Sequence, residues 1–136
     1  MFRVQNLFAL SSVAFLAFGF VLSKVPGAAG ITLAISGHRG YGIASQTPLY
    51  LIGTLFGLFA FFYSIGYLSF NQTMAHWHFA LSVLGVLLII IGWALFPNAN
   101  INLIVASIAV GLLFFLSAQL WFAFDITRAV VHLLGS

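Results

Sequence analysis

Four long apolar stretches, none containing a charged residue, constrain this chain more than any other feature. They cover residues 4–23, 49–70, 73–96 and 101–124. At ~1.5 Å of rise per residue, a helix over any of them is long enough to span the ~30 Å hydrocarbon layer of a membrane. The four Lys or Arg residues and the single acid all lie outside them; they are Arg3, Lys24, Arg39, Arg128 and Asp125. The sequence therefore predicts an all-α fold, an integral membrane four-helix bundle that forms one transmembrane domain over residues 1–136.

The composition supports this class and excludes several others. Apolar residues make up 63% of the chain and aromatic residues 17%, values far outside the range of soluble domains. The net charge of +3 comes from too few groups to form a nucleic-acid surface, and the lack of a basic cluster argues against a specific anionic-lipid site. With no Cys, the chain has no disulfide, thiolate nucleophile or Cys-held iron–sulfur cluster.

The first apolar stretch resembles a signal peptide only in having Arg3 before it. Its apolar part is longer than the core of a signal peptide, and Lys24-Val25-Pro26 lacks the small residues of a cleavage site. We therefore expect a retained transmembrane helix.

Residues 24–48 form the only long connection, and their Gly and Pro residues rule out a regular spanning helix. We expect a loop that folds back on the bundle or against a neighbouring subunit. Its most polar part, Ser36–Gly42, could contact a phosphate or a heme propionate, although a solvated turn is the simpler interpretation. The other connections are tight turns, in which Asn71 is expected to cap the third helix and Asn98 or Asn100 the fourth.

Small and polar residues inside the apolar stretches suggest where helices meet. Gly53 and Gly57 form a G-x-x-x-G motif, which indicates close helix packing or a flat surface for an aromatic or macrocyclic group. Gln119 is expected to bond a neighbouring helix. Asp125 and Arg128 stand three residues apart at a helix end, where a local ion pair is the simplest interpretation.

Two histidines lie near the start of the third helix. At ~100° per residue, His76 and His78 point roughly 200° apart and so look out from opposite faces. A neutral imidazole on a membrane helix is costly to leave without a partner, so each ring needs a hydrogen bond, a lipid headgroup or a metal.

The scarcity of charge also limits the possible functions. Transporters and proton pumps usually bury ionisable groups in their spans, whereas here the only acid lies at a helix end. No Ser-His-Asp set, phosphate-binding loop or carboxylate pair can be assembled. We expect neither ion translocation by this chain alone nor an autonomous enzyme.

The stretch Ala75–Ser82 reads Ala-His-Trp-His-Phe-Ala-Leu-Ser and is followed by Gly85. It resembles the tenth transmembrane helix of subunit I of heme-copper terminal oxidases, which carries an Ala-His-aromatic-His-aromatic pattern. In that family the histidine pair ligates two hemes, one on each side of the helix. The resemblance implies that His76 matches the ligand of the high-spin heme and His78 a ligand of the low-spin heme. It makes both residues candidate heme-binding and metal ligands.

The resemblance covers only this short stretch. Before the pair the family has a His-Asp-Thr-Tyr-Tyr-like sequence, whereas this chain has Ser-Phe-Asn-Gln-Thr at Ser69–Thr73. A complete oxidase also needs three copper-binding His and a second axial His, but only His38 and His132 remain, and neither lies in a predicted span. Counting ligands therefore excludes an autonomous oxidase.

Two classes of function stay open. In the first, the chain is a small heme-binding protein of respiratory electron transfer or sensing, whose second axial ligand comes from another copy of itself. In the second, it is a non-catalytic accessory subunit of a larger energy-converting membrane complex. Both imply the lipid bilayer and other membrane subunits or a homo-oligomer as partners, in a membrane that we expect to be the bacterial inner membrane.

Overall fold

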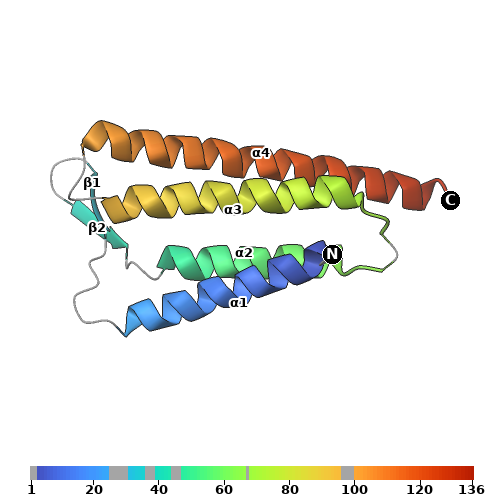
Figure 1. Cartoon of the computed structure of the whole chain (residues 1–136), viewed down its shortest axis with the longest axis horizontal. Coiled ribbons are helices and arrows are strands. Elements are labelled where there is room, and N and C mark those ends of the chain that lie inside the picture. Colours follow the sequence, from blue (N-terminus) through green and yellow to red (C-terminus); the bar gives the residue numbers. More distant parts are fainter. Residues whose placement is uncertain (1–2, 25–30, 36–38, 44–46, 67, 96–99) are drawn as a thin grey trace. The chain divides into compact units, whose positions relative to one another are not determined.

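The computed structural model describes residues 3–24, 31–35, 39–43, 47–66, 68–95 and 100–136. Within these ranges the elements in chain order are α1 (Val4–Ser23), β1 (Ile31–Ile35), β2 (Arg39–Ile43), α2 (Thr47–Tyr63), α3 (Gln72–Leu95) and α4 (Ile101–Leu134) (Figure 1). The prediction of four helices is confirmed. The chain divides into two compact units, residues 1–64 and 65–136, which are described one at a time. The single transmembrane domain stays a prediction.

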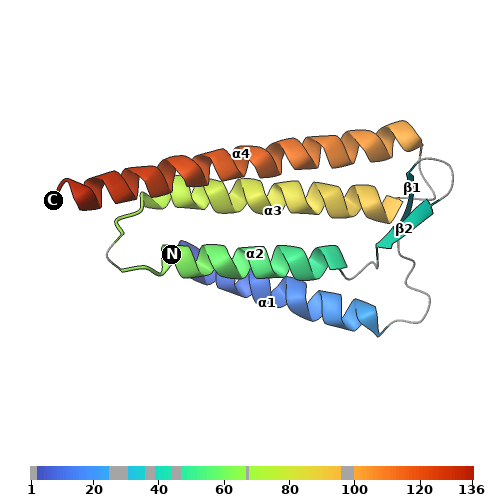
Figure 2. The ribbon, with the colours of Figure 1, turned by 180° about the vertical axis from the view of Figure 1, so that it is seen from behind.

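In the first unit, α1 and α2 run side by side (Figures 1 and 2) and share an aromatic core. Phe8 of α1 is fully buried, and its ring centroid lies 5.4 Å from that of Phe56, 5.3 Å from that of Phe59 and 5.8 Å from that of Tyr63. The Phe8 and Phe56 rings meet edge to face, an arrangement that the aromatic quadrupole favours. Apolar and aromatic packing thus holds these two helices together.

The Gly53 and Gly57 motif lies where α2 approaches α1. A Cβ atom added to Gly53 would lie 2.7 Å from Cγ of Leu16, and one added to Gly57 would lie 3.1 Å from Oγ of Ser12. The Ser12 hydroxyl donates a hydrogen bond of 2.6 Å to the carbonyl oxygen of Gly53. These contacts confirm the helix-packing interpretation, because α1 already fills the notch that a macrocycle would have used.

The connection predicted as a loop contains a two-stranded antiparallel sheet. β1 pairs with β2 so that Ile31 lies opposite Ile43 and Leu33 lies opposite Tyr41. The Gly residues do exclude a spanning helix, as expected, but a hairpin tolerates them and gains from its β-branched residues. The polar cluster Ser36–Gly42 is expected to form a turn or to contact a phosphate. Its residues 36–38, which include His38, lie outside the described residues.

The second helix ends earlier than the apolar pattern suggested, at Tyr63 rather than at residue 70. Ser64 donates its backbone N–H to the carbonyl of Ala60 at 3.1 Å and its hydroxyl to the same oxygen at 2.7 Å. A new turn follows, in which the N–H of Leu68 bonds to the carbonyl of Ile65. The apolar pattern continues to residue 70, but it does not indicate where the hydrogen bonds of the helix stop.

In the second unit, α3 and α4 run side by side (Figures 1 and 2) and approach at glycines. A Cβ atom added to Gly85 would lie 2.7 Å from the carbonyl oxygen of Gly111, and one added to Gly111 would lie 2.7 Å from that of Gly85. The hydroxyl of Ser107 donates a 2.8 Å hydrogen bond to the carbonyl of Leu88. The two backbones therefore touch, which only residues without a side chain allow.

Both helices of the second unit begin at the asparagine caps that the sequence predicts. The Asn71 side-chain oxygen accepts the backbone N–H groups of Thr73 at 3.0 Å and Met74 at 3.2 Å. The Asn100 side chain accepts the N–H of Asn102 at 2.9 Å. Each cap thus provides a hydrogen-bond acceptor for backbone N–H groups that have no partner within the helix.

The last helix continues past its predicted end at residue 124. α4 has 34 residues and ends at Leu134, so at ~1.5 Å per residue it is about 51 Å long. The charged turn at Asp125 and Arg128 does not stop it, because the good helix formers and apolar residues after it keep one side of the helix packed, with Ala129 buried.

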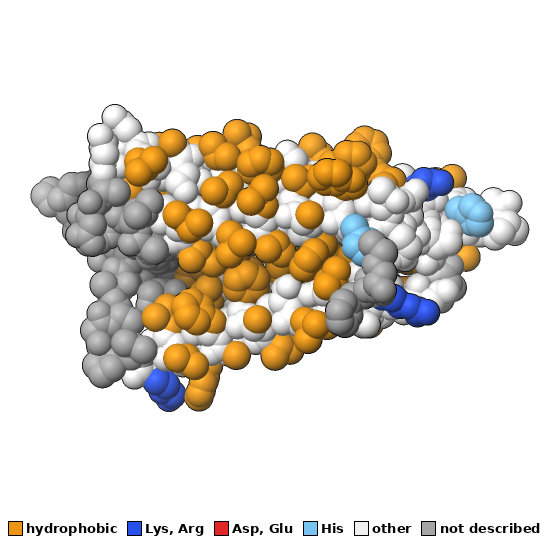
Figure 3. All heavy atoms as spheres, viewed as in Figure 1, with side chains coloured by type: hydrophobic (Ala, Val, Ile, Leu, Met, Phe, Trp, Pro, Cys, Tyr) orange, Lys and Arg blue, Asp and Glu red, His pale blue; other side chains and the backbone are white. Residues whose placement is uncertain are grey.

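Three of the described helices are long and apolar enough to cross a membrane by length and composition: Val4–Ser23, Gln72–Gly92 and Ile101–Leu134. α2, with 17 residues, is a shorter apolar helix. Large apolar side chains are exposed on every helix, among them Phe18, Phe61, Leu84 and Phe124. In Figure 3 such side chains cover much of the visible surface of the helices, whereas Lys and Arg side chains lie near helix ends. The helices are thus compatible with a membrane protein.

Candidate functional site

The first turn of α3, which carries both candidate histidines, is fixed to α4 by a buried carboxylate. The backbone N–H of Asn71 donates a 2.9 Å hydrogen bond to Oδ1 of Asp125, which is fully buried. A helix start leaves several N–H groups without helical partners, and a carboxylate is a favourable acceptor there. The hydrogen bond that the structure shows for Asp125, the only acid, therefore joins α4 to the start of α3. The charge of Arg128 also acts on the Asp125 carboxylate.

His78 lies in the interface between α3 and α4. Its ring is fully buried and stacks on Phe122 of α4, with ring centroids 4.9 Å apart and an angle of 24° between the planes. The side chain of Gln119, also on α4, interacts with the imidazole. Its amide nitrogen donates a hydrogen bond to the carbonyl of Phe115 on its own helix at 3.2 Å, so the expected bond to a neighbouring helix stays a prediction.

Ser82 lies one turn after His78, on the same side of α3. It is fully buried, and its hydroxyl has no hydrogen-bond partner among the described residues. The interface between α3 and α4 therefore holds an imidazole and a hydroxyl in an apolar setting, where polar groups are costly to bury.

His76 has a different environment. Its Nδ1 lies 2.6 Å from the carbonyl oxygen of Gln72 in the preceding turn, and the side chain is half-buried. A carbonyl oxygen can only accept, so Nδ1 carries the proton and Nε2 carries the lone pair. Nε2 is shielded from solvent and has no hydrogen-bond partner within the described part of the chain. The ring is thus held in the tautomer that offers Nε2 as a ligand.

The structure separates the two histidines, as the spacing predicts. His78 contacts α4, whereas the polar contact of His76 is to its own helix, and two residues of helix turn the rings roughly 200° apart. The two rings therefore do not act on one ligand. In the described residues no group of three or more His, Asp or Glu could hold a metal ion.

Comparisons of this chain with protein-family models, with curated proteins and with solved structures found no match. The roles of the candidate residues therefore rest on their own geometry and chemistry.

Sequence reasoning missed two partners of the site, for different reasons. The stacking of Phe122 on His78 joins α3 and α4, and one of 16 Phe residues gives no local signal of such a contact. The bond between Asp125 and Asn71 could have been inferred, because two antiparallel helices joined by a short turn place the end of the second near the start of the first. A buried acid at that position needs a donor, and a helix start has donors to spare.

Proposed function

We propose that this protein is a small heme-binding protein of respiratory electron transfer, embedded in the bacterial inner membrane, with His76 as an axial ligand of the heme iron. The observation that carries the proposal is the hydrogen bond from Nδ1 of His76 to the Gln72 carbonyl. Metal-ligating histidines almost always donate their other ring N–H to a carbonyl or carboxylate, which fixes the ring and raises its basicity. A free Nε2 behind such a bond fits an iron ligand.

The surroundings of His76 also fit a flat macrocycle. Thr73 lies one turn before it and Ala80 one turn after it, so both share its side of the helix. Both are small and exposed, which leaves room against α3. Bound heme would supply an iron that accepts and releases one electron. The chain would orient it through His76 and shield it with apolar side chains.

In this proposal His78 packs the helix pair rather than binding iron. Its ring is enclosed by Phe122 and Gln119, and a heme at this position would have to displace α4. One histidine of the pair would therefore hold the cofactor, and a further iron ligand would come from another copy of the chain. The protein is then a homo-oligomer and not an autonomous enzyme.

A second candidate function is that of a non-catalytic accessory subunit in a larger energy-converting membrane complex. The observation that favours it is the number of large apolar side chains exposed on every helix, including Leu51 on α2, Trp77 on α3 and Leu113 on α4. In lipid such faces pack on other helices as readily as on acyl chains. Co-purification of defined partner subunits, from cells in which the protein lacks heme, would favour this function.

The test of heme binding is an absorption spectrum of protein expressed with ample heme, recorded oxidised and then reduced with dithionite. The wild type should show a Soret band that shifts on reduction. His76→Gly should lose it and regain it when imidazole is added, because free imidazole can occupy the emptied ligand position. His132→Ala is the matched control and should keep the band, and circular dichroism should show unchanged helix content in both variants.

Two results would contradict the proposal. A wild-type protein without Soret absorbance would leave the histidines structural and favour the accessory role. A His76→Gly variant that keeps its Soret band, together with a His78→Ala variant that loses it, would move the ligand to the face that α4 covers.

A further inference from the structure

A cavity of about 220 Å³ lies at the end of the second unit where α3 begins. Five of the described residues line it, three from the connection before α3 and two from the last turns of α4: Ser69, Phe70, Asn71, Arg128 and His132. None of them belongs to the proposed heme site. The two groups lie far apart along the chain, and the fold brings them together.

The lining carries the chemistry of a phosphate site. Arg128 and His132 are four residues apart on α4, so their side chains share one side of the helix. A guanidinium offers a planar set of donors that matches phosphate oxygens, and an imidazole and the hydroxyl of Ser69 add further donors. All three residues are exposed, so a ligand can reach them.

The nearby acid is not one of the described residues that line the cavity. Asp125 lies one turn before Arg128, but it is fully buried and does not line the cavity. Its Oδ1 accepts the N–H of Asn71, and its Oδ2 is also buried. The cavity is therefore lined by a fixed cation, an imidazole and uncharged groups.

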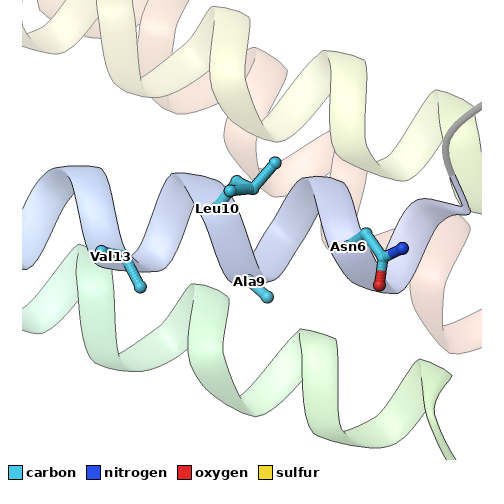
Figure 4. Close-up of a pocket in the computed structure, with 4 residues that line it drawn as sticks. All are labelled: Asn6, Ala9, Leu10 and Val13. Atoms are coloured by element: carbon cyan, nitrogen blue, oxygen red, sulfur yellow. The ribbon is translucent and has the colours of Figure 1, made fainter.

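A second hollow has a different lining and lacks the groups that would bind a phosphate. It measures about 360 Å³ and lies along α1, where Asn6, Ala9, Leu10 and Val13 line it (Figure 4). Among the described residues that line it, Asn6 alone is polar and none is charged. It is larger than the cavity at Arg128 but offers no group that would bind an anion.

The length of α4 places the cavity at the depth of lipid headgroups. If residues 101–124 span the hydrocarbon layer, then at ~1.5 Å per residue Arg128 lies about 6 Å beyond its edge and His132 about 12 Å beyond it. Each headgroup layer is roughly 5 to 8 Å thick, so Arg128 lies within it. Phe70 adds an aromatic ring at the same boundary.

We propose that the cavity lined by Ser69, Phe70, Asn71, Arg128 and His132 binds a phosphate group, supplied by the headgroup of an anionic lipid. The phosphate site itself does not depend on heme. The lipid as its source rests on the membrane insertion included in the proposed function.

The test uses the full chain in a detergent that contains no phosphate. It is titrated separately with a short-chain phosphatidylglycerol, with the matching diacylglycerol and with inorganic phosphate, and native mass spectrometry measures the fraction of one-to-one complex. Arg128→Gln should weaken phosphatidylglycerol binding about tenfold, the loss expected when a charge-assisted hydrogen bond is removed. Arg3→Gln, which removes one positive charge at the start of α1, should leave binding unchanged.

The outcomes are separable. Saturable binding of phosphatidylglycerol alone, lost in Arg128→Gln, supports a lipid headgroup, whereas equal binding of inorganic phosphate with the same loss supports the phosphate site with a free anion as its source. Diacylglycerol binding as tight as that of phosphatidylglycerol, or an Arg128→Gln variant that binds like the wild type, overturns the proposal. If Arg128→Gln loses its helix content, the phosphatidylglycerol binding of His132→Gln is compared with that of Arg3→Gln instead. Since the Soret band is recorded on the same samples, a failure of heme binding is seen independently.

Discussion

The two helix pairs of this protein are joined in different ways. In the pair of α1 and α2, aromatic rings fill the interface, and the hydroxyl of the buried Ser12 donates to a carbonyl. In the pair of α3 and α4, the backbones touch at glycines, and the interface holds His78, Ser82 and Asp125, all fully buried. Polar groups are costly to bury in an apolar setting, so the second pair depends more on hydrogen bonds that satisfy them, such as the bond from Asn71 to Asp125. Aromatic rings thus join the first pair, whereas close backbones and buried polar groups join the second.

The largest expected effect tests the aromatic core of the first pair. Phe8→Ala removes a fully buried ring that contacts three other rings, and large-to-small substitutions of Phe cost about 3–5 kcal/mol of unfolding free energy. The measurement is unfolding in mixed micelles with increasing dodecyl sulfate, followed by circular dichroism. Phe61→Ala is the control, since this ring is 65% exposed and should matter little. Equal losses in the two variants would show that the first pair does not depend on this core.

The next effect tests the glycine contact of the second pair. A Cβ atom on Gly85 would meet backbone atoms of α4 at 2.7 Å, so Gly85→Ala should force the helices apart and cost about 1–3 kcal/mol. A Cβ atom on Gly66 would meet no atom of the described residues within 4 Å, and Gly66→Ala is therefore the matched control. The same unfolding measurement compares them. A Gly85→Ala variant as stable as the control would mean that the two backbones are not in contact.

A third prediction concerns the carboxylate that joins α4 to the start of α3. Asp125→Ala leaves the N–H of Asn71 without its acceptor and should cost about 1–3 kcal/mol. Asp125→Asn keeps an acceptor oxygen and should retain much of that stability. Hydrogen exchange at the amide of Asn71, followed by NMR, should speed up in the Ala variant and change less in the Asn variant. No difference between the two variants would argue against this hydrogen bond.

The smallest effect compares one substitution in both pairs. Ser12→Ala removes a hydroxyl that donates to Gly53 and should cost about 0.5–1.5 kcal/mol. Ser82→Ala removes a buried hydroxyl with no hydrogen-bond partner in the described part of the chain, so it should be neutral or stabilising. Unfolding in mixed micelles gives the sign of each change. A destabilising Ser82→Ala would show that this hydroxyl has a partner, such as bound water or a ligand.

Local sequence was sufficient for features that depend on neighbours within about one turn. Apolar length gave four helices, and the chemistry of Asn71 and Asn100 gave two caps that the structure confirms. The opposite directions of His76 and His78 follow from helical geometry alone. The ends of α2 and α4 differed from expectation, because hydropathy marks where a helix can be apolar rather than where its hydrogen bonds stop.

Contacts between residues far apart in the chain were decided by the tertiary structure. The bond between Asn71 and Asp125 spans 54 positions, and the stacking of His78 on Phe122 and the touching of Gly85 and Gly111 likewise depend on how α3 and α4 are aligned. That alignment is set by the total packing of two helix faces, which no short segment encodes. The same alignment encloses His78 against Phe122, whereas the polar contact of His76 is to its own helix, and it brings Arg128 and His132 to Ser69. The sequence thus supplied the candidate ligands, and packing between helices decided what surrounds each of them.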